Sequence, residues 1–72
     1  MDEYVEVQYD TTRDVYVDGT LCGTTNKIMT VQTGTHVFDL GQPVIYVPAS
    51  ITKLVQGTSP LAPLQLKFVA DL

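Results

Sequence analysis

The sequence predicts an all-β protein, a small antiparallel β-sandwich of about seven short strands. Valine, isoleucine and threonine make up 23 of the 72 residues, and branching at Cβ favours the extended backbone of a strand. No window of 12 residues carries apolar positions at helical spacing without an intruding Gly, Pro or Thr cluster. Apolar and polar residues instead alternate with a period of two between turn-rich segments, at a spacing typical of a sandwich or partly open barrel.

The first three strands are predicted at Tyr4–Tyr9, Val15–Val17 and Thr20–Cys22. In the first of these, the valines and the last tyrosine occupy odd-numbered positions and share one face, with the polar residues opposite. The second and third strands are separated only by Asp18 and Gly19. Since a type I′ turn requires positive φ at both central positions, this Asp-Gly pair predicts a β-hairpin.

Four further strands are predicted at Lys27–Val31, His36–Leu40, Ile51–Val55 and Leu64–Val69. In Lys27–Val31 the residues at positions 28 and 30 share a face. In His36–Leu40 the histidine shares a face with the apolar residues at positions 38 and 40, and the even-numbered residues of Leu64–Val69 share one as well. Val44–Val47 is a short apolar stretch between two prolines, each of which removes a backbone donor.

Length and charge limit the function classes. A chain of 72 residues forms one domain, residues 1–72. The net charge is −4 and the four basic residues are scattered singly, which excludes the clustered cations that a nucleic-acid partner requires. No apolar run approaches the roughly 18 residues of a membrane span, so we expect no membrane insertion. If Met1 is the native start, the absence of a signal peptide predicts a cytoplasmic protein.

The sequence offers no evident metal or cofactor site. Cys22 is the single cysteine, so it forms no internal disulfide, and no cationic neighbour along the chain marks it as reactive. Cys22 and His36 are too few for the usual four zinc ligands. Asp10, Asp14 and Asp18 recur every fourth residue but lack the close alternation of a calcium loop. We therefore predict no metal and no cofactor, with a packed or half-exposed cysteine and solubilising aspartates.

His36 is the one histidine, and its phase predicts that it packs at the margin of the core at a strand start. A small enzyme built on His36 with Cys22 or an aspartate is the least favoured alternative, because no spacing brings a nucleophile to the imidazole. We predict no catalytic residues.

Aromatic and acidic residues give two further expectations. Four tyrosines could form a sugar- or peptide-binding platform, but their phases differ, and packing at the core edge is the favoured interpretation. They are Tyr4, Tyr9, Tyr16 and Tyr46. Asp2, Glu3 and Glu6 are expected to keep an end strand soluble and to discourage edge pairing.

From position 15 to position 68 the order of turn and strand motifs resembles that of the PEGA domain, a small β-sandwich module of many bacterial and archaeal proteins. The matching segments are Val15–Gly19, Cys22–Thr25, Gly34–Phe38, Tyr46, Ile51–Val55, Gly57, and the alternating Leu64, Leu66 and Phe68. The chain departs from the family in three places. Thr11–Asp14 occupies the place of the Pro-x-Gly-Ala segment after which the family is named. Asn26 replaces a proline of the family pattern, and Ile45 replaces a glycine. The resemblance implies a non-catalytic module, often appended to larger proteins and often at the cell surface.

These observations together predict a non-catalytic interaction or structural module. We expect a protein partner or a homo-oligomer formed by pairing at an exposed strand edge. The alternative is a small carbohydrate- or ligand-binding β domain, which the absence of tryptophan makes less favoured.

Overall fold

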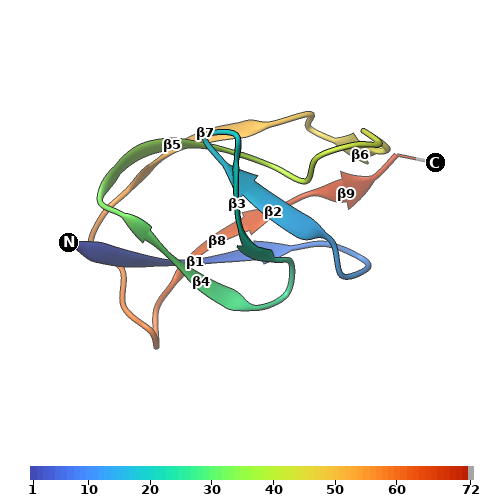
Figure 1. The fold of residues 1–72 in the computed structure, drawn as a ribbon. Coiled ribbons are helices and arrows are strands. Elements are labelled where there is room, and N and C mark those ends of the chain that lie inside the picture. The colour runs from blue at the N-terminus through green and yellow to red at the C-terminus, as the bar shows by residue number, and fades with distance from the viewer. Residues whose placement is uncertain (72) are drawn as a thin grey trace.

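The structure is a computed structural model that describes residues 1–71. Nine strands form two facing sheets and a short ribbon at one end (Figure 1). The strands are β1 (Asp2–Gln8), β2 (Asp14–Val17), β3 (Thr20–Thr24), β4 (Ile28–Gln32), β5 (Gly34–Asp39), β6 (Tyr46–Val47), β7 (Ile51–Val55), β8 (Leu64–Lys67) and β9 (Val69–Ala70). All seven predicted strands are present, and the predicted all-β sandwich is confirmed.

The smaller sheet has the strand order β4-β1-β8, with β1 in the middle. Val5 pairs with Met29 of antiparallel β4 on one side and with Leu64 of parallel β8 on the other. The sandwich is therefore antiparallel except for the β1–β8 pair, which brings together distant parts of the chain. The expectation that the acidic residues of β1 protect an end strand is wrong, because β1 is paired along both edges.

The larger sheet has the strand order β3-β2-β5-β7. The predicted hairpin joins β2 to β3, and φ is 53° at Asp18 and 82° at Gly19, as a type I′ turn requires. On its other side β2 pairs with β5, where Val17 lies opposite Phe38. The strongest local signal in the sequence thus places β3, an outer strand, beside the central strand β2.

A β-bulge interrupts the hairpin at Cys22. Val15 pairs with Gly23, whereas Tyr16 pairs with Leu21, which leaves Cys22 as an extra residue in β3. The Cys22 side chain is exposed, and its thiol is free.

The β6–β9 ribbon covers one end of the sandwich. Tyr46 pairs with Ala70 in antiparallel register. The strand predicted over residues 64–69 is broken at Phe68, whose side chain is fully buried. Of the apolar stretch at residues 44–47, only the last two residues form a strand.

The inner faces of both sheets supply one hydrophobic core. Its members among the described residues are Val5, Val7, Val15, Val17, Met29, Val31, Phe38, Leu40, Tyr46, Val55, Leu66 and Phe68. The predicted apolar faces of the fifth and last strands are confirmed by this set. In β4 the core face belongs to Met29 and Val31, so Ile28 and Thr30 share the exposed face.

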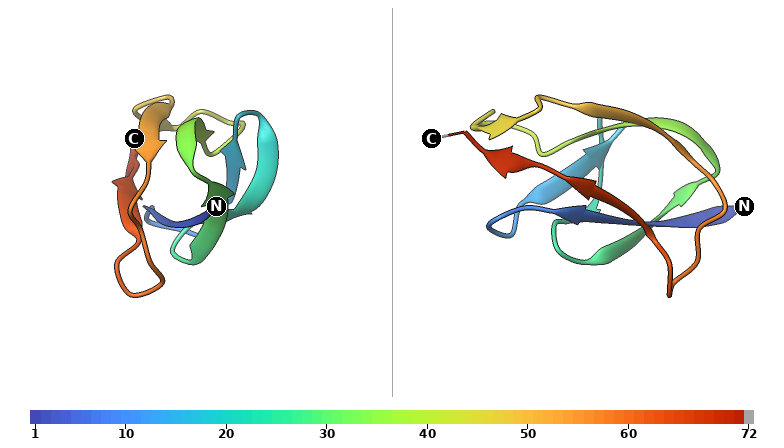
Figure 2. Two further views of the ribbon diagram at one scale, coloured as in Figure 1. Left: turned by 90° about the vertical axis from the view of Figure 1, so that its left-hand side faces the viewer. Right: turned by 180° about the vertical axis from the view of Figure 1, so that it is seen from behind.

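The two long sides of the sandwich differ. On the closed side the chain passes from β3 in one sheet to β4 in the other. A Cβ at Gly23 would lie 3.1 Å from Sδ of Met29, so glycine permits this close passage. On the open side β7 and β8 are the outer strands of their sheets, and no described residue of one pairs with the other. Figure 2 places β7 and β8 together on one side, away from the β2–β3 hairpin.

Candidate functional site

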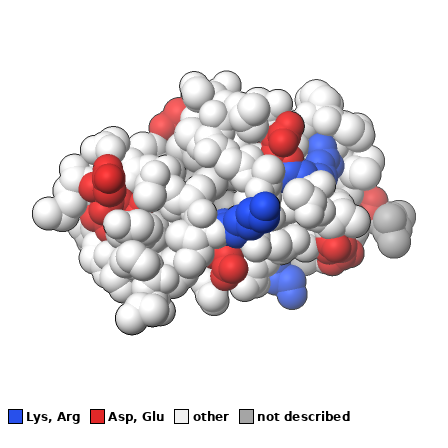
Figure 3. Space-filling view, turned by 60° about the horizontal axis from the view of Figure 1, so that its bottom comes forward, with Lys and Arg blue, Asp and Glu red and all other residues white. Residues whose placement is uncertain are grey.

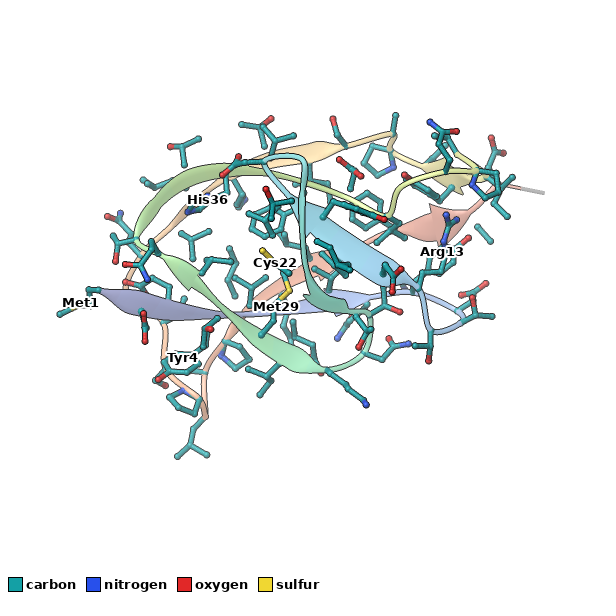
Figure 4. All side chains as sticks on the ribbon, viewed as in Figure 1. Met1, Tyr4, Arg13, Cys22, Met29 and His36 are labelled. Atoms are coloured by element: carbon teal, nitrogen blue, oxygen red, sulfur yellow. The ribbon has the colours of Figure 1, made fainter. Side chains whose placement is uncertain are left out.

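Polar and aromatic side chains gather at opposite ends of the sandwich. Met1 and His36 lie towards one end and Arg13 towards the other (Figure 4). We call the first the polar end, which contains the side chains of Glu3, Asp18, His36, Thr33 and Thr58. The second is the aromatic end, which contains the side chains of Tyr9, Arg13, Tyr46 and Phe68.

His36 and Asp18, which are 18 residues apart, form an ion pair at the polar end. Nδ1 of His36 lies 2.6 Å from Oδ2 of Asp18, and Nε2 lies 2.7 Å from the backbone oxygen of Gln32. The other carboxylate oxygen, Oδ1, accepts a hydrogen bond of 2.9 Å from the backbone N–H of Val37. One imidazole ring therefore connects the tip of the β2–β3 hairpin to the end of β4. The predicted place of His36 at the core margin agrees with its side-chain exposure of 17%.

This geometry favours the doubly protonated ring. Each ring nitrogen faces an oxygen acceptor, so each must carry a proton to make both hydrogen bonds. The hydrogen bond to Asp18, and then that to the Gln32 carbonyl, raise the pKa of His36 above its ordinary value of 6.5. In return, the hydrogen bonds from His36 and from the Val37 N–H lower the pKa of Asp18 below 3.8.

The ion pair is unsuited to general base catalysis in this arrangement. A general base needs a free lone pair within reach of the proton that it removes, and both nitrogens of this imidazolium donate to protein oxygens. The structure shows no hydrogen bond between His36 and Cys22 within residues 1–71. Sequence reasoning identified His36 as a candidate but did not identify Asp18 as its partner.

Glu3 forms a second polar cluster that the sequence analysis interpreted wrongly. Its side chain is only 4% exposed. Thr33 donates its hydroxyl over 2.7 Å, and Thr58 donates both its hydroxyl, over 2.5 Å, and its backbone N–H, over 2.9 Å. The Thr58 hydroxyl in turn accepts from the Tyr4 N–H over 2.7 Å. A residue expected to solubilise an end strand is instead a buried acceptor that fastens the loop after β7 to β1.

The donors around Glu3 hold it ionised. The hydroxyl of Thr33, then the hydroxyl and the backbone N–H of Thr58, lower the pKa of Glu3 to about 2. One signal in the sequence pointed to this burial, since Glu3 shares the odd-numbered phase of Val5 and Val7. Its charge favoured an exposed position, because a carboxylate is rarely buried without partners.

At the aromatic end, Arg13 lies over the ring of Tyr46, with its guanidinium carbon 5.1 Å from the ring centroid. Nη2 of Arg13 donates to the backbone oxygens of Leu40 and Gly41 over 3.1 and 3.2 Å. The Tyr46 hydroxyl also donates to Gly41 over 2.9 Å. Edge-on contacts of the Tyr46 ring with Tyr9 and Phe68 complete the cluster. Arg13 is thus a structural cation that holds a loop.

The tyrosines do not share one surface. Tyr46 is buried, and Tyr9 packs against the core beside it. Tyr16, which belongs to the larger sheet, packs against Gly41. Tyr4 belongs to the opposite sheet and points away from the core. The expectation of core-edge packing agrees with the positions of Tyr9 and Tyr46, whereas Tyr4 and Tyr16 alternate with buried residues and lie on the outer faces of their sheets.

The predicted aspartate series is dispersed over a loop, a strand start and a hairpin turn. Asp10 lies between β1 and β2, Asp14 begins β2, and Asp18 is in the turn. Across residues 1–71 no three His, Cys, Asp or Glu side chains are placed to hold a metal ion together, and these residues form no pocket.

The outer surfaces of the two sheets differ in polarity. On the smaller sheet, side-chain amides pair with carboxylates: Gln32 donates to Asp2 over 2.9 Å, and Gln65 donates to Glu6 over 3.2 Å. Figure 3 shows both signs of charge interspersed on the face that it presents. On the larger sheet, leucines stand exposed on the two outer strands, with Leu21 of β3 at 55% and Leu54 of β7 at 52%.

No protein-family model, curated protein or solved structure matches the chain. In the described part of the chain there is no helix long and apolar enough to cross a membrane.

Proposed function

We propose that this chain is a non-catalytic β-sandwich interaction module that binds a protein partner, or a second copy of itself, through a strand edge on its open side. The observation that carries the proposal is that β7 and β8 each end a sheet on the same side of the molecule. An outer strand has backbone N–H and C=O groups that can accept an added strand.

The open side is fastened at both ends, which supports the proposal. At the aromatic end, β6 precedes β7 and β9 follows β8, and the pairing of β6 with β9 ties the two together. At the polar end, the Glu3–Thr58 hydrogen bonds fix the loop that follows β7. An edge held at both ends loses little conformational entropy when a partner strand is added.

Exposed apolar residues lie on the same side. Leu54 points outward from β7, and Leu61 in the β7–β8 loop is 98% exposed. The side chains of the polar end, in contrast, form hydrogen bonds with other parts of this chain. His36, Asp18 and Glu3 hold structural elements together, so they are not free to act on a substrate. The resemblance to the PEGA domain also suggests a non-catalytic module, and it remains a prediction.

Leu54→Glu tests the proposal, with Leu21→Glu as its matched control. The two leucines are almost equally exposed on the two outer strands of one sheet, and each substitution should change stability by only about 0.5 kcal/mol or less. Light scattering over a range of concentrations measures self-association, and retention from native lysate measures partner binding. We expect Leu54→Glu to abolish the association that the unmodified chain shows and Leu21→Glu to retain it. A chain that stays monomeric and retains no partner, or loses association equally in both variants, contradicts the proposal.

A further inference from the structure

We propose that His36 is a pH-sensitive latch: its imidazolium ties the β2–β3 turn to the end of β4, and loss of its second proton opens that tie. The proposal goes beyond the binding function above and does not depend on it. It rests first on the geometry of the ring, which lies 2.6 Å from Oδ2 of Asp18 and 2.7 Å from the oxygen of Gln32.

A neutral imidazole cannot satisfy both of these contacts. It carries one N–H and one lone pair, so one of the two nitrogens must face an oxygen with no proton between them. The carboxylate of Asp18 is the stronger acceptor, and it keeps the remaining N–H on Nδ1. The hydrogen bond from Nε2 to the Gln32 carbonyl is therefore the one that is lost.

The rest of the hairpin does not depend on this proton. The backbone N–H of Asp18 donates to the oxygen of Val37 over 2.8 Å, and the N–H of Val37 donates to Oδ1 of Asp18 over 2.9 Å. Neither donor titrates near neutral pH. The opening is consequently local: the turn from β4 into β5 separates from the hairpin tip while both sheets stay intact.

Histidine is also the side chain suited to respond near neutral pH, since its ordinary pKa lies between pH 5 and 8. The other ionisable groups around the latch come from three places. They are Asp18 in the hairpin turn, Lys53 opposite His36 on β7, and the amino group of Met1 with Asp2 and Glu3 beside the end of β4. A variant at His36 separates the latch from all of these groups.

The sign of the pH dependence follows from the raised pKa of His36. The stabilisation that the latch provides is fully present below the unfolded value of 6.5 and is lost as pH rises through the higher folded value.

Two variants with NMR titration and urea unfolding test the latch. His36→Gln removes the titrating ring. Asp18→Asn keeps a residue suited to the positive φ of the turn and an oxygen for the Val37 N–H, but it removes the negative charge. The amide of Thr33 shares its peptide group with the Gln32 carbonyl, so its chemical shift reports on the bond that opens.

In the unmodified protein we expect the His36 ring to titrate above 6.5, with the Thr33 amide signal moving at the same midpoint and stability falling over the same range. His36→Gln should lose this alkaline decrease, and Asp18→Asn should move the His36 midpoint to lower pH. The amide of Ala70, at the other end of the molecule, should not follow the titration. A ring that titrates at or below 6.5, or a Thr33 signal that ignores the titration, overturns the latch.

Discussion

The two ends of the sandwich perform the same structural task with different chemistry. At the polar end, carboxylates accept hydrogen bonds from hydroxyls, backbone N–H groups and an imidazolium, and these contacts join β1, the hairpin and the loop after β7. At the aromatic end, rings in edge-on contact and a cation over Tyr46 join the ribbon to the core. The first set depends on protonation, whereas the second depends mainly on apolar burial. We therefore expect the stability of the polar end to depend on pH and that of the aromatic end to be nearly independent of it.

The largest effect is expected at the aromatic end, from Phe68→Ala. Phe68 is fully buried and its ring centroid lies 5.3 Å from that of Tyr46. Removing a buried phenylalanine ring costs about 3–5 kcal/mol, a large part of the stability of a small domain. Urea unfolding followed by circular dichroism measures the loss, and Phe68→Leu, which keeps most of the apolar volume, should cost about 1 kcal/mol. If the stability lost in Phe68→Ala differs strongly between acid and neutral pH, the two ends do not differ in their dependence on pH.

A pH-dependent effect is expected at the polar end, from Glu3→Gln. Because the pKa of Glu3 is lowered from 4.5 to about 2, its contribution is present above 4.5 and is lost as pH falls towards 2. The substitution should lower stability at neutral pH and flatten the acid limb of the stability curve. Unfolding measured across this range by urea titration checks both effects.

Glu6→Gln is the matched control for this experiment. Glu6 lies on the same strand but on the outer face, where it accepts a hydrogen bond from Gln65 over 3.2 Å. The decrease in stability at acid pH should be retained in this variant. If Glu6→Gln flattens it as much as Glu3→Gln does, the buried cluster is not the source of the acid sensitivity.

The features that sequence reasoning found are those encoded by neighbouring residues. Asp18-Gly19 determines its turn through local backbone geometry, and alternation in β5 and β8 determines which side chains enter the core. The pairing of β1 with β8 was not predictable in the same way. It joins Val5 to Leu64 across almost the whole chain, and no local pattern distinguishes a parallel partner from an antiparallel one.

The candidate site was predictable only in part, for a related reason. The phase of His36 placed it correctly at the core margin, but its partner depends on how β2 and β5 pair. Glu3 had the phase of a core residue, yet its burial requires two threonines, Thr33 and Thr58, that come from separate loops. The conformation of Asn26 likewise depends on a contact with a residue distant in the sequence. Its backbone N–H donates to the oxygen of Val7 at a φ of 65°, and a proline could supply neither that donor nor that φ.

The central claim is that the two fastened ends leave β7 as an ordered strand with a free edge. Amide hydrogen exchange, measured on the dilute chain and on the associated chain or its complex, tests this claim most directly. We predict that β7 amides directed away from β5 exchange rapidly when the chain is dilute and become protected on association, while the amides of β3 do not change. Protection that arises on β3 instead, or β7 amides that exchange equally in both states, would contradict the account.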